Sequence, residues 1–370
     1  MAEFAAVLKE SAPAYLKGRA DNTIRNRLLL MLLAKNGRIK YNASSHKLYW
    51  DVKAGQRVIE AYGDDGVINF QRSDLHEQLN IDWRGYKMSD RMTEKQKLML
   101  GDMTAIINRY SGIAEDMMDD LQDGFCGELF VDGYDASNTN RLHGLESFFG
   151  FTDGSTDADD RIAFPNDSYG GHATNLGTRG GTWSTNFGAG NYPNDAVATD
   201  WPDGNGTADY DWNTPKLVNY SASTWGTGST SWADNCERVL GQTTIWTTLT
   251  GGKKGRPTIY LLSGDLFYEY QNKMRAKYRI SVPHREANDL GFTETLNQDG
   301  VMIQPDFDVP SQTGYGLNIN QMVLESLDSV LFSSRGPEYD INTDGYLWLI
   351  GFFGNARYNV KHFSKLKNFS

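Results

Sequence analysis

Cysteine is scarce in this chain: Cys126 and Cys236 are the only two among 370 residues. Two cysteines are too few for a disulfide framework, and they favour folding in a reducing cytoplasm. Residues 1–10 lack the charged-then-apolar pattern of a signal peptide. The longest apolar run, Leu28–Leu33, is far shorter than the roughly 20 residues that cross a bilayer. We therefore expect a protein that is made and folded in a cytoplasm, without a membrane partner.

Known catalytic motifs are also missing. The chain has no Walker A phosphate loop, no H-E-x-x-H zinc motif, no G-x-S-x-G elbow and no C-x-x-C pair. The stretch 251–256 is rich in Gly and Lys but lacks the spacing and the Ser or Thr of a phosphate loop, so we interpret it as a solvated turn. None of the six histidines is spaced as a metal ligand. They are His46, His76, His143, His172, His284 and His362. We therefore predict no catalytic, cofactor-binding or metal-binding residues, and no enzyme.

One acidic loop leaves a metal site open as an alternative. Residues 153–160 contain Asp153, Asp157, Asp159 and Asp160, and Ca²⁺ prefers several hard oxygen ligands. The flanking helices and the terminal Glu of an EF-hand are absent. The pattern therefore favours an exposed acidic loop over a calcium site.

The composition is that of a folded globular protein, with 39% hydrophobic and 22% charged residues. A formal net charge of -11 argues against nucleic-acid binding by the whole chain. The charge is unevenly distributed, since residues 1–50 carry nine Lys or Arg, whereas residues 151–230 carry ten Asp. The two segments could attract each other between subunits, the basic segment could face a polyanion, or both could be solvated faces.

Hydrophobic periodicity predicts the elements of the first half. A helix is expected over 22–35, ended by Asn36-Gly37. Alternation over 47–53 predicts a strand. Residues 57–62 and 67–72 flank the turn sequence Gly63–Gly66, which predicts a hairpin. Such a hairpin is marginal in water alone and is expected to find its partner in another subunit.

The longest helical pattern covers 93–125. Thr93 and Gln96 match a capping box at its start, and apolar residues recur at the helical period for about 50 Å. The Ser111-Gly112 pair is a candidate bend in this helix. A strand is expected to follow over 128–131.

Residues 151–230 differ from the rest in being dense in Gly, Asn, Asp, Ser and Thr with scattered Trp. The aromatic residues favour an ordered, loop-rich insertion over a disordered linker. Beyond it we predict helices over 234–249 and from 263 to about 278. The expected strands are 258–262, 301–307, 322–327, 346–353 and one near 357–363. Helices beside mostly separate strands indicate an α+β class.

The order of these segments resembles that of the major capsid (coat) proteins of tailed bacteriophages, which share the Hong Kong 97 fold. Short strings along most of the chain resemble one branch of these proteins, and the resemblance is weakest over 151–230. The strings are Arg25–Leu30, Gly37–Ile39, Leu48–Val52, Trp83–Tyr86, Gly144–Phe148, Asn297–Val301, Thr313–Asn318 and Gly336–Asp340.

The resemblance implies an α+β, Hong Kong 97-like phage capsid fold with an irregular insertion. The parts expected are an N-terminal arm (1–46), an E-loop-like hairpin (47–88), a P-domain with a long spine helix (89–150), the Gly/Asp/Trp-rich insertion (151–230), an A-domain (231–345) and C-terminal return strands to the P-domain (346–370).

The same resemblance implies a structural protein of the virion. Copies are expected to self-assemble into hexamers and pentamers of an icosahedral head that encloses double-stranded DNA. The other partners implied are a separate scaffold protein, a portal and a decoration protein, with the packaged DNA contacted non-specifically if at all. Assembly is expected in the cytoplasm of the bacterial host, without a cofactor and without a covalent crosslink between subunits.

Two other functions remain open. A glycoside hydrolase would use the tryptophans of residues 151–230 as a sugar platform and needs two carboxylates about 5–10 Å apart. A carbohydrate-binding module would use the same aromatic residues without catalysis. Tryptophans in a loop-rich segment more often form a small local core, which favours neither function.

Overall fold

The computed structural model describes residues 28–54, 61–62, 75–100, 103–150, 162–163, 167–174, 212–221, 225–251, 254–277 and 296–368. The chain divides into two compact units. Unit 1 comprises Met1–His46, Asp82–Leu145 and Met322–Arg357, and unit 2 comprises Lys47–Ile81, Glu146–Gln321 and Tyr358–Ser370. Each unit is thus assembled from three separate stretches of sequence. Among the helices described, none has both the length and the hydropathy to cross a membrane.

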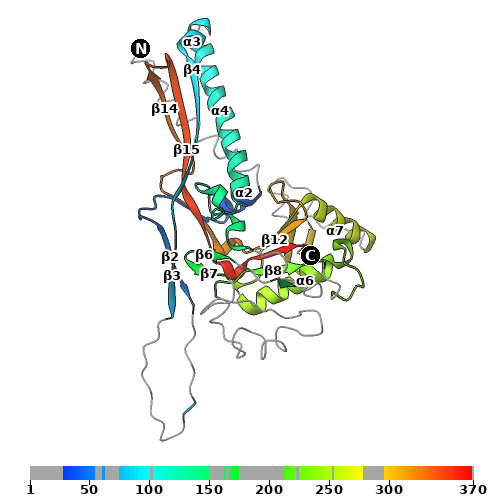
Figure 1. The fold of residues 1–370 in the computed structure, drawn as a ribbon. Coiled ribbons are helices and arrows are strands. Elements are labelled where there is room, and N and C mark those ends of the chain that lie inside the picture. Colours follow the sequence, from blue (N-terminus) through cyan, green and yellow to red (C-terminus); the bar gives the residue numbers. More distant parts are fainter. Residues whose placement is uncertain are drawn as a thin grey trace. The chain divides into compact units, whose positions relative to one another are not determined.

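Unit 1 contains a five-stranded sheet (Figure 1). Its strands are β1 (Ile39–Lys40), β4 (Arg84–Thr93), β13 (Met322–Ser326), β14 (Ser333–Asp340) and β15 (Gly345–Tyr358). The order is β1-β13-β15-β14, and β4 also pairs with β15. The β4–β15 pairing is antiparallel from Gly345↔Thr93 to Gly354↔Arg84. Since β14 also pairs with β15 in the antiparallel sense, these strands form a long three-stranded segment, the β4–β15–β14 sheet.

A long helix lies along this sheet (Figure 1). The helices of unit 1 are α2 (Leu28–Lys35), α3 (Glu94–Leu100) and α4 (Met103–Glu128). Aromatic rings join α4 to β15: the Tyr110 ring lies 5.3 Å from that of Trp348, and the Phe125 ring lies 4.6 Å from that of Phe352. These contacts bury the apolar stripe of α4, which the helical period predicts.

Unit 2 is built on a seven-stranded sheet of mixed direction, in the order β10-β11-β9-β12-β16-β8-β5. The strands are β5 (Ile162–Ala163), β8 (Lys216–Asn219), β9 (Ile259–Leu262), β10 (Leu296–Gln298), β11 (Val301–Pro305), β12 (Thr313–Leu317) and β16 (Ser364–Lys367). Helices α6 (Trp232–Gly251) and α7 (Gly264–Lys277) pack on it. The core between them includes Trp232, Val239, Trp246, Tyr260, Leu262, Phe267, Tyr270 and Ile303.

Two small hairpins complete unit 2. β2 (Leu48–Lys53) pairs with β3 (His76–Ile81) in the antiparallel sense, and β6 (Ser168–Tyr169) pairs with β7 (His172–Ala173). The described chain also contains short 3₁₀ helices at Ala136–Asn138, Leu145–Phe148, Ile319–Gln321 and Val360–His362.

Several predicted elements are confirmed. Helix α2 ends at Lys35, and Gly37 adopts a positive φ of 62° while Arg38 N–H donates to Leu33 O, as a Schellman cap requires. The capping box is also present: Thr93 N–H donates to Gln96 Oε1, and Gln96 N–H donates to Thr93 Oγ1. The predicted strands at 47–53, 258–262, 301–307 and 322–327 and both later helices correspond to β2, β9, β11, β13, α6 and α7.

Other predictions were wrong. The helix expected to end at 125 extends further: its described parts are α3 and α4, on either side of residues 101–102, and α4 continues through Ser111-Gly112 to Glu128. The strand expected over 128–131 is a tight turn, in which Leu129 and Phe130 N–H groups donate to Cys126 and Gly127 carbonyls. Both side chains are buried in this turn. Their apolar character, at the end of a helix, therefore led to the incorrect prediction of a buried strand. The last strand was placed too early: β15 extends to Tyr358, a 3₁₀ turn follows, and β16 begins at Ser364.

Some predictions lie outside the described residues. These are the arm up to residue 27, most of the hairpin over 57–72, and the acidic loop 153–160. Of the segment 151–230, the structure describes 162–163, 167–174, 212–221 and 225–230.

Candidate functional site

No group of three or more His, Cys, Asp or Glu side chains in the described part of the chain could hold a metal ion. Two histidines, His143 in unit 1 and His362 in unit 2, have pKa values well below the usual value. His284 lies outside the described residues, and His46 and His76 are exposed. His172 packs edge-on against Trp212 at 5.2 Å.

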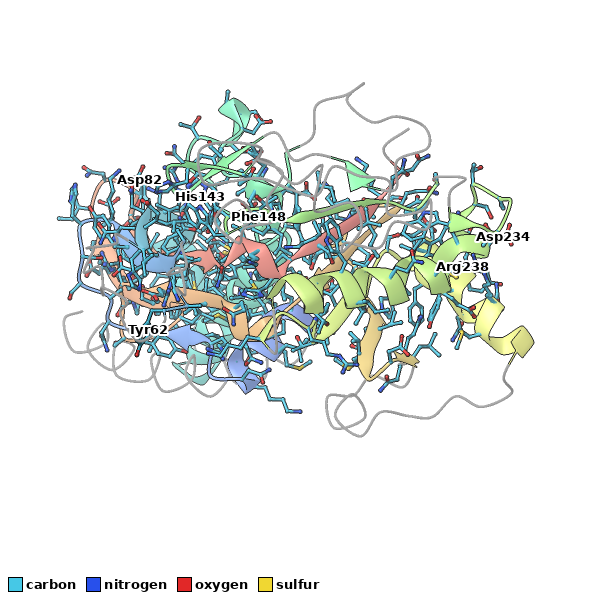
Figure 2. The ribbon with its side chains drawn as sticks, turned by 90° about the horizontal axis from the view of Figure 1, so that it is seen from below. Tyr62, Asp82, His143, Phe148, Asp234 and Arg238 are labelled. Carbon is cyan, nitrogen blue, oxygen red and sulfur yellow. The ribbon has the colours of Figure 1, made fainter. Side chains whose placement is uncertain are left out.

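His143 is buried in unit 1 beside Asp82 (Figure 2). Its ring stacks on Tyr134 at 4.3 Å, and its backbone N–H donates to Asn355 Oδ1 at 3.2 Å. Burial, and then the Arg84 cation, lower the pKa of His143 to about 4, with Asp82 opposing. The imidazole is therefore neutral at pH 7 and acts as a core side chain.

His362 is the corresponding buried histidine of unit 2. Burial lowers its pKa to about 3, helped by the nearby cations Lys216, Lys361 and Lys254. Lys216 is itself buried, and its Nζ donates to Lys361 O at 2.8 Å. Because this ammonium group donates hydrogen bonds to backbone carbonyls, it stabilises the fold around β8 and β16.

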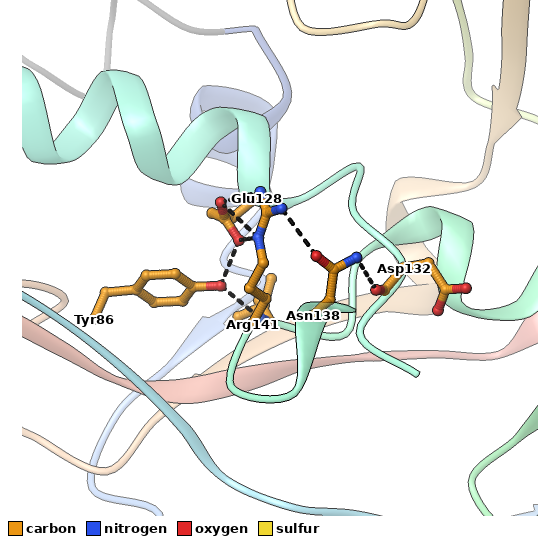
Figure 3. A network of polar contacts seen from close by, with 6 residues as sticks. Tyr86, Glu128, Asp132, Asn138 and Arg141 are labelled. Carbon is orange, nitrogen blue, oxygen red and sulfur yellow. Dashed lines mark hydrogen bonds and ion pairs between the residues drawn. The ribbon is translucent and has the colours of Figure 1, made fainter. Parts of the chain in front are cut away.

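A polar network closes the C-terminal end of α4 in unit 1 (Figure 3). Tyr86 OH donates to Glu128 Oε2 at 2.6 Å and accepts from Leu142 N–H at 2.5 Å. Arg141 contacts the same carboxylate through two nitrogens, with Nε at 2.8 Å from Oε2 and Nη2 at 2.5 Å from Oε1. A carboxylate at a helix C-terminus is unfavourable, and a bidentate guanidinium compensates for it. The network thus ties β4, the end of α4 and the following loop together.

A second ion pair, between Lys365 and Glu146 of unit 2, is mostly buried. Lys365 Nζ on β16 donates to Glu146 Oε2 at 2.5 Å, and Tyr315 OH on β12 donates to Glu146 Oε1. Burial raises the pKa of Tyr315 well above its usual value, and the Glu146 carboxylate adds to the effect. The phenol therefore stays protonated as a hydrogen-bond donor, and the cluster is structural.

The tryptophans predicted as a possible sugar platform are buried where the structure describes them. Trp225 belongs to the core of unit 2, and its Nε1 donates to Asn219 O at 2.9 Å. Trp212 is also buried. Trp183 and Trp201 lie outside the described residues. Two of the four rings are therefore unavailable for stacking on a sugar.

The described surface of unit 1 exposes apolar side chains at one end. Leu98 and Met99 on α3 are 73% and 78% exposed, and Ile341 in the β14–β15 turn is 83% exposed. The Glu94 N–H at the start of α3 donates to Asp344 O in that turn at 2.9 Å, so the two elements meet (Figure 1). We call Leu98, Met99 and Ile341 the apolar tip.

The turn that carries Ile341 is well ordered by hydrogen bonds. Asn342 N–H and Thr343 Oγ1 donate to the Asp340 carboxylate at 3.0 and 2.9 Å. Tyr339 OH donates to Asp344 Oδ1 at 2.7 Å. The tip is thus a defined surface with exposed apolar groups, which is typical of an interaction site. Sequence analysis missed it, because β14 and its turn show no period-two pattern.

No protein-family model matches the sequence, and no curated protein matches it. Solved structures do match. The capsid asymmetric unit of cyanophage A-1(L) is similar with a TM-score of 0.54 and 12% identity, over 90% of this chain and 90% of that chain. The mature capsid of bacteriophage PhiM1 gives 0.52 and 10% identity, over 92% and 87%. The capsid of a native GTA particle gives 0.51 and 8% identity, over 91% and 90%.

At these identities the likeness is one of fold. It extends over about nine tenths of the chain rather than over one module. The chain has an α+β fold similar to that of bacteriophage capsid proteins, which confirms the α+β capsid class within the fold that the sequence resemblance predicted.

Proposed function

We propose that this protein is the major capsid protein of a tailed bacteriophage, a structural component of the virion without enzymatic activity. Copies self-assemble into hexamers and pentamers of an icosahedral head that encloses double-stranded DNA. The observation that carries the proposal is the match in fold to a cyanophage capsid over 90% of each chain.

Two surfaces described above support self-assembly. The apolar tip exposes three large side chains on an ordered scaffold. The β2–β3 hairpin is two-stranded, and its outer residues, Asp51, Lys53 and His76, are exposed. A two-stranded hairpin is marginal alone, and exposed apolar groups favour association. Closed symmetry would cover both surfaces in every copy.

The proposal assigns the parts of the chain as the sequence resemblance implies. Residues 1–46 are the N-terminal arm, 47–88 the E-loop-like hairpin, 89–150 the P-domain with α4 as its spine helix, 151–230 the insertion, 231–345 the A-domain and 346–370 the return strands. A separate scaffold protein, a portal and a decoration protein are its further partners. The packaged DNA is contacted non-specifically if at all, and assembly takes place in the host cytoplasm.

Electron microscopy with size-exclusion chromatography tests the proposal, on the chain expressed alone and together with a scaffold protein. Shells, rings or capsomers are expected in at least one condition. A monodisperse monomer in both conditions would contradict the proposal. Glycan binding by such a monomer would instead favour the carbohydrate-binding function.

A further inference from the structure

One face of the β2–β3 hairpin is covered at the hairpin base, where the two strands leave the rest of unit 2. Leu48 and Trp50 on β2 lie opposite Ile81 and Leu79 on β3, and all four side chains are buried. Beyond the Trp50↔Leu79 pair the next partners, Val52 and Glu77, are only partly buried. Some element of unit 2 must therefore cover the base.

That element is the β6–β7 hairpin. Asn80 N–H on β3 donates to Gly170 O in the β6–β7 turn at 3.2 Å. The Tyr169 ring lies 5.8 Å from the Trp50 ring, and His172 Nε2 lies 3.3 Å from Gln78 O. Backbone and side-chain contacts thus join the two hairpins.

Gly170 fits against Leu79 because it lacks a side chain. A Cβ at Gly170 would lie 2.7 Å from Leu79 Cβ and 2.8 Å from Leu79 Cδ2, well inside ordinary contact distances. Gly171, the next residue of the same turn, offers a contrast. It also has a positive φ, 89° against 64° for Gly170, but a Cβ there would meet nothing nearer than Asn80 Nδ2 at 3.9 Å.

The β6–β7 turn is itself fixed to the body of unit 2. Asn213, which is buried, donates through Nδ2 to Tyr169 O and His172 O at 3.5 and 3.3 Å. Tyr169 OH accepts from Tyr358 N–H at 3.3 Å. The Tyr169 ring also packs against Phe148 at 5.4 Å, and Phe148 contacts Phe363 just before β16 at 5.7 Å. A continuous series of contacts therefore connects the hairpin base to the seven-stranded sheet.

We propose that residues 167–174 together with Asn213 form a seat that sets the direction in which the β2–β3 hairpin leaves unit 2, with Gly170 as its positioning residue. This assigns a role to part of the segment 151–230. Only the consequence of this inference rests on the proposed function: in a capsid, the hairpin must point in the correct direction to reach a neighbouring copy.

Paired spin labels in the full chain measure the direction without requiring assembly. Cysteines replace Lys53 on β2 and Glu269 on α7, both of which are exposed, and double electron–electron resonance gives their distance distribution. Gly170→Ala is expected to broaden or displace the distribution. Gly171→Ala, the matched control, should leave it unchanged, because it imposes the same kind of backbone strain without the steric clash.

His172→Ala is a second variant that removes the contact with Gln78 O and keeps Gly170. It is expected to broaden the distribution less than Gly170→Ala does, and it serves if Gly170→Ala does not fold. A distribution identical to the reference in His172→Ala and, where it folds, in Gly170→Ala would overturn the proposal. Equal changes in Gly170→Ala and Gly171→Ala would overturn it as well.

Assembly assays then separate this inference from the proposed function. If the unsubstituted chain forms shells, Gly170→Ala is expected to yield fewer or aberrant shells, whereas Gly171→Ala assembles normally. Normal shells from a Gly170→Ala chain with a displaced hairpin would overturn the role in assembly. If the unsubstituted chain never assembles, the proposed function fails, and the spin-label distances alone decide whether the seat exists.

Discussion

Unit 2 buries its central strands, whereas unit 1 leaves the two outer strands of the β4–β15–β14 sheet largely accessible. Every residue of β8, β9 and β12 is buried. In β4 only Met92 is buried, and in β14 only Pro337 is. Unit 2 therefore contains a core of its own between two helices and a sheet. Unit 1 packs its longest helix, α4, on an extended sheet whose outer strands β4 and β14 have few buried residues.

A pair of leucines gives the largest expected difference between the units. Leu262 at the centre of the unit 2 sheet is 0% exposed, whereas Leu98 of the apolar tip is 73% exposed. Leu262→Ala is expected to lower the free energy of unfolding by about 3 kcal/mol through lost burial and a cavity. Leu98→Ala should change it by no more than about 0.5 kcal/mol. Chemical denaturation measures both free-energy changes. Equal changes in the two variants would contradict the contrast between a buried Leu262 and an exposed Leu98.

Ion pairs sharpen the same comparison. The Lys365–Glu146 pair of unit 2 is mostly buried, with a contact of 2.5 Å. Glu146→Gln leaves Lys365 without a counter-charge and is expected to cost about 2 kcal/mol, less than for a fully buried pair because Glu146 is partly accessible. Lys40 of unit 1 lies 3.8 Å from Glu325 and is 57% exposed. Lys40→Met should cost less than about 0.5 kcal/mol, and denaturant midpoints compare the two variants.

The two buried histidines allow the acid sensitivity of each unit to be measured separately. His143 in unit 1 has its pKa lowered to about 4 and His362 in unit 2 to about 3, both mainly by burial. Their unfolded-state pKa is about 6.5. Because the unfolded chain binds these protons first, stability is full above about pH 6.5 and falls below it, by up to about 1.4 kcal/mol per pH unit for each histidine.

The measurement is denaturation at several pH values from 7 down to 4. His143→Gln and His362→Gln should each flatten the dependence below pH 6.5, and probes placed in unit 1 and in unit 2 should each respond to one substitution. Carboxylates add their own acid sensitivity to all variants, so the difference between curves isolates the histidine. An unchanged slope in both variants would mean that neither imidazole is held neutral.

The sequence strings behind the capsid resemblance acquire physical reasons in the structure. Asp299 and Gly300 occupy the β10–β11 turn with φ of 53° and 77°, the geometry of a type I′ hairpin that favours Asp-Gly. Gly314 lies in β12, where a Cβ would be 2.6 Å from Leu262 Cδ2. Local turn chemistry of the first kind can be read from a sequence. The close packing of Gly314 cannot, since it depends on a residue far along the chain.

Several strands that sequence analysis missed depend on distant parts of the chain, and β4 and β14 are two of them. β4 alternates between partly buried and exposed residues over its first six positions, and only one residue of β14, Pro337, is fully buried. Their pairing with β15 depends on distant parts of the chain. The Glu128–Arg141 ion pair likewise depends on the turn after α4. Sequence analysis had predicted a strand at this turn because of its apolar residues. Long-range pairing therefore limited the prediction even for the fully buried strands β8 and β12, whereas the end of α2 and the capping box at the start of α3 were readable.

A substitution in the apolar tip is expected to change the unfolding free energy least. It therefore tests the effect on assembly separately from any effect on folding. Ile341→Ser removes an apolar group that is 83% exposed in the isolated chain, so the unfolding free energy should stay within about 0.5 kcal/mol of the reference. If the tip is buried between copies, the same substitution removes interface area and assembly should fall strongly. Thr343→Ser in the same turn keeps the hydroxyl that donates to Asp340 and is the matched control. Light scattering and electron microscopy follow shell formation, and undiminished shells from Ile341→Ser would show that the tip contacts no other copy.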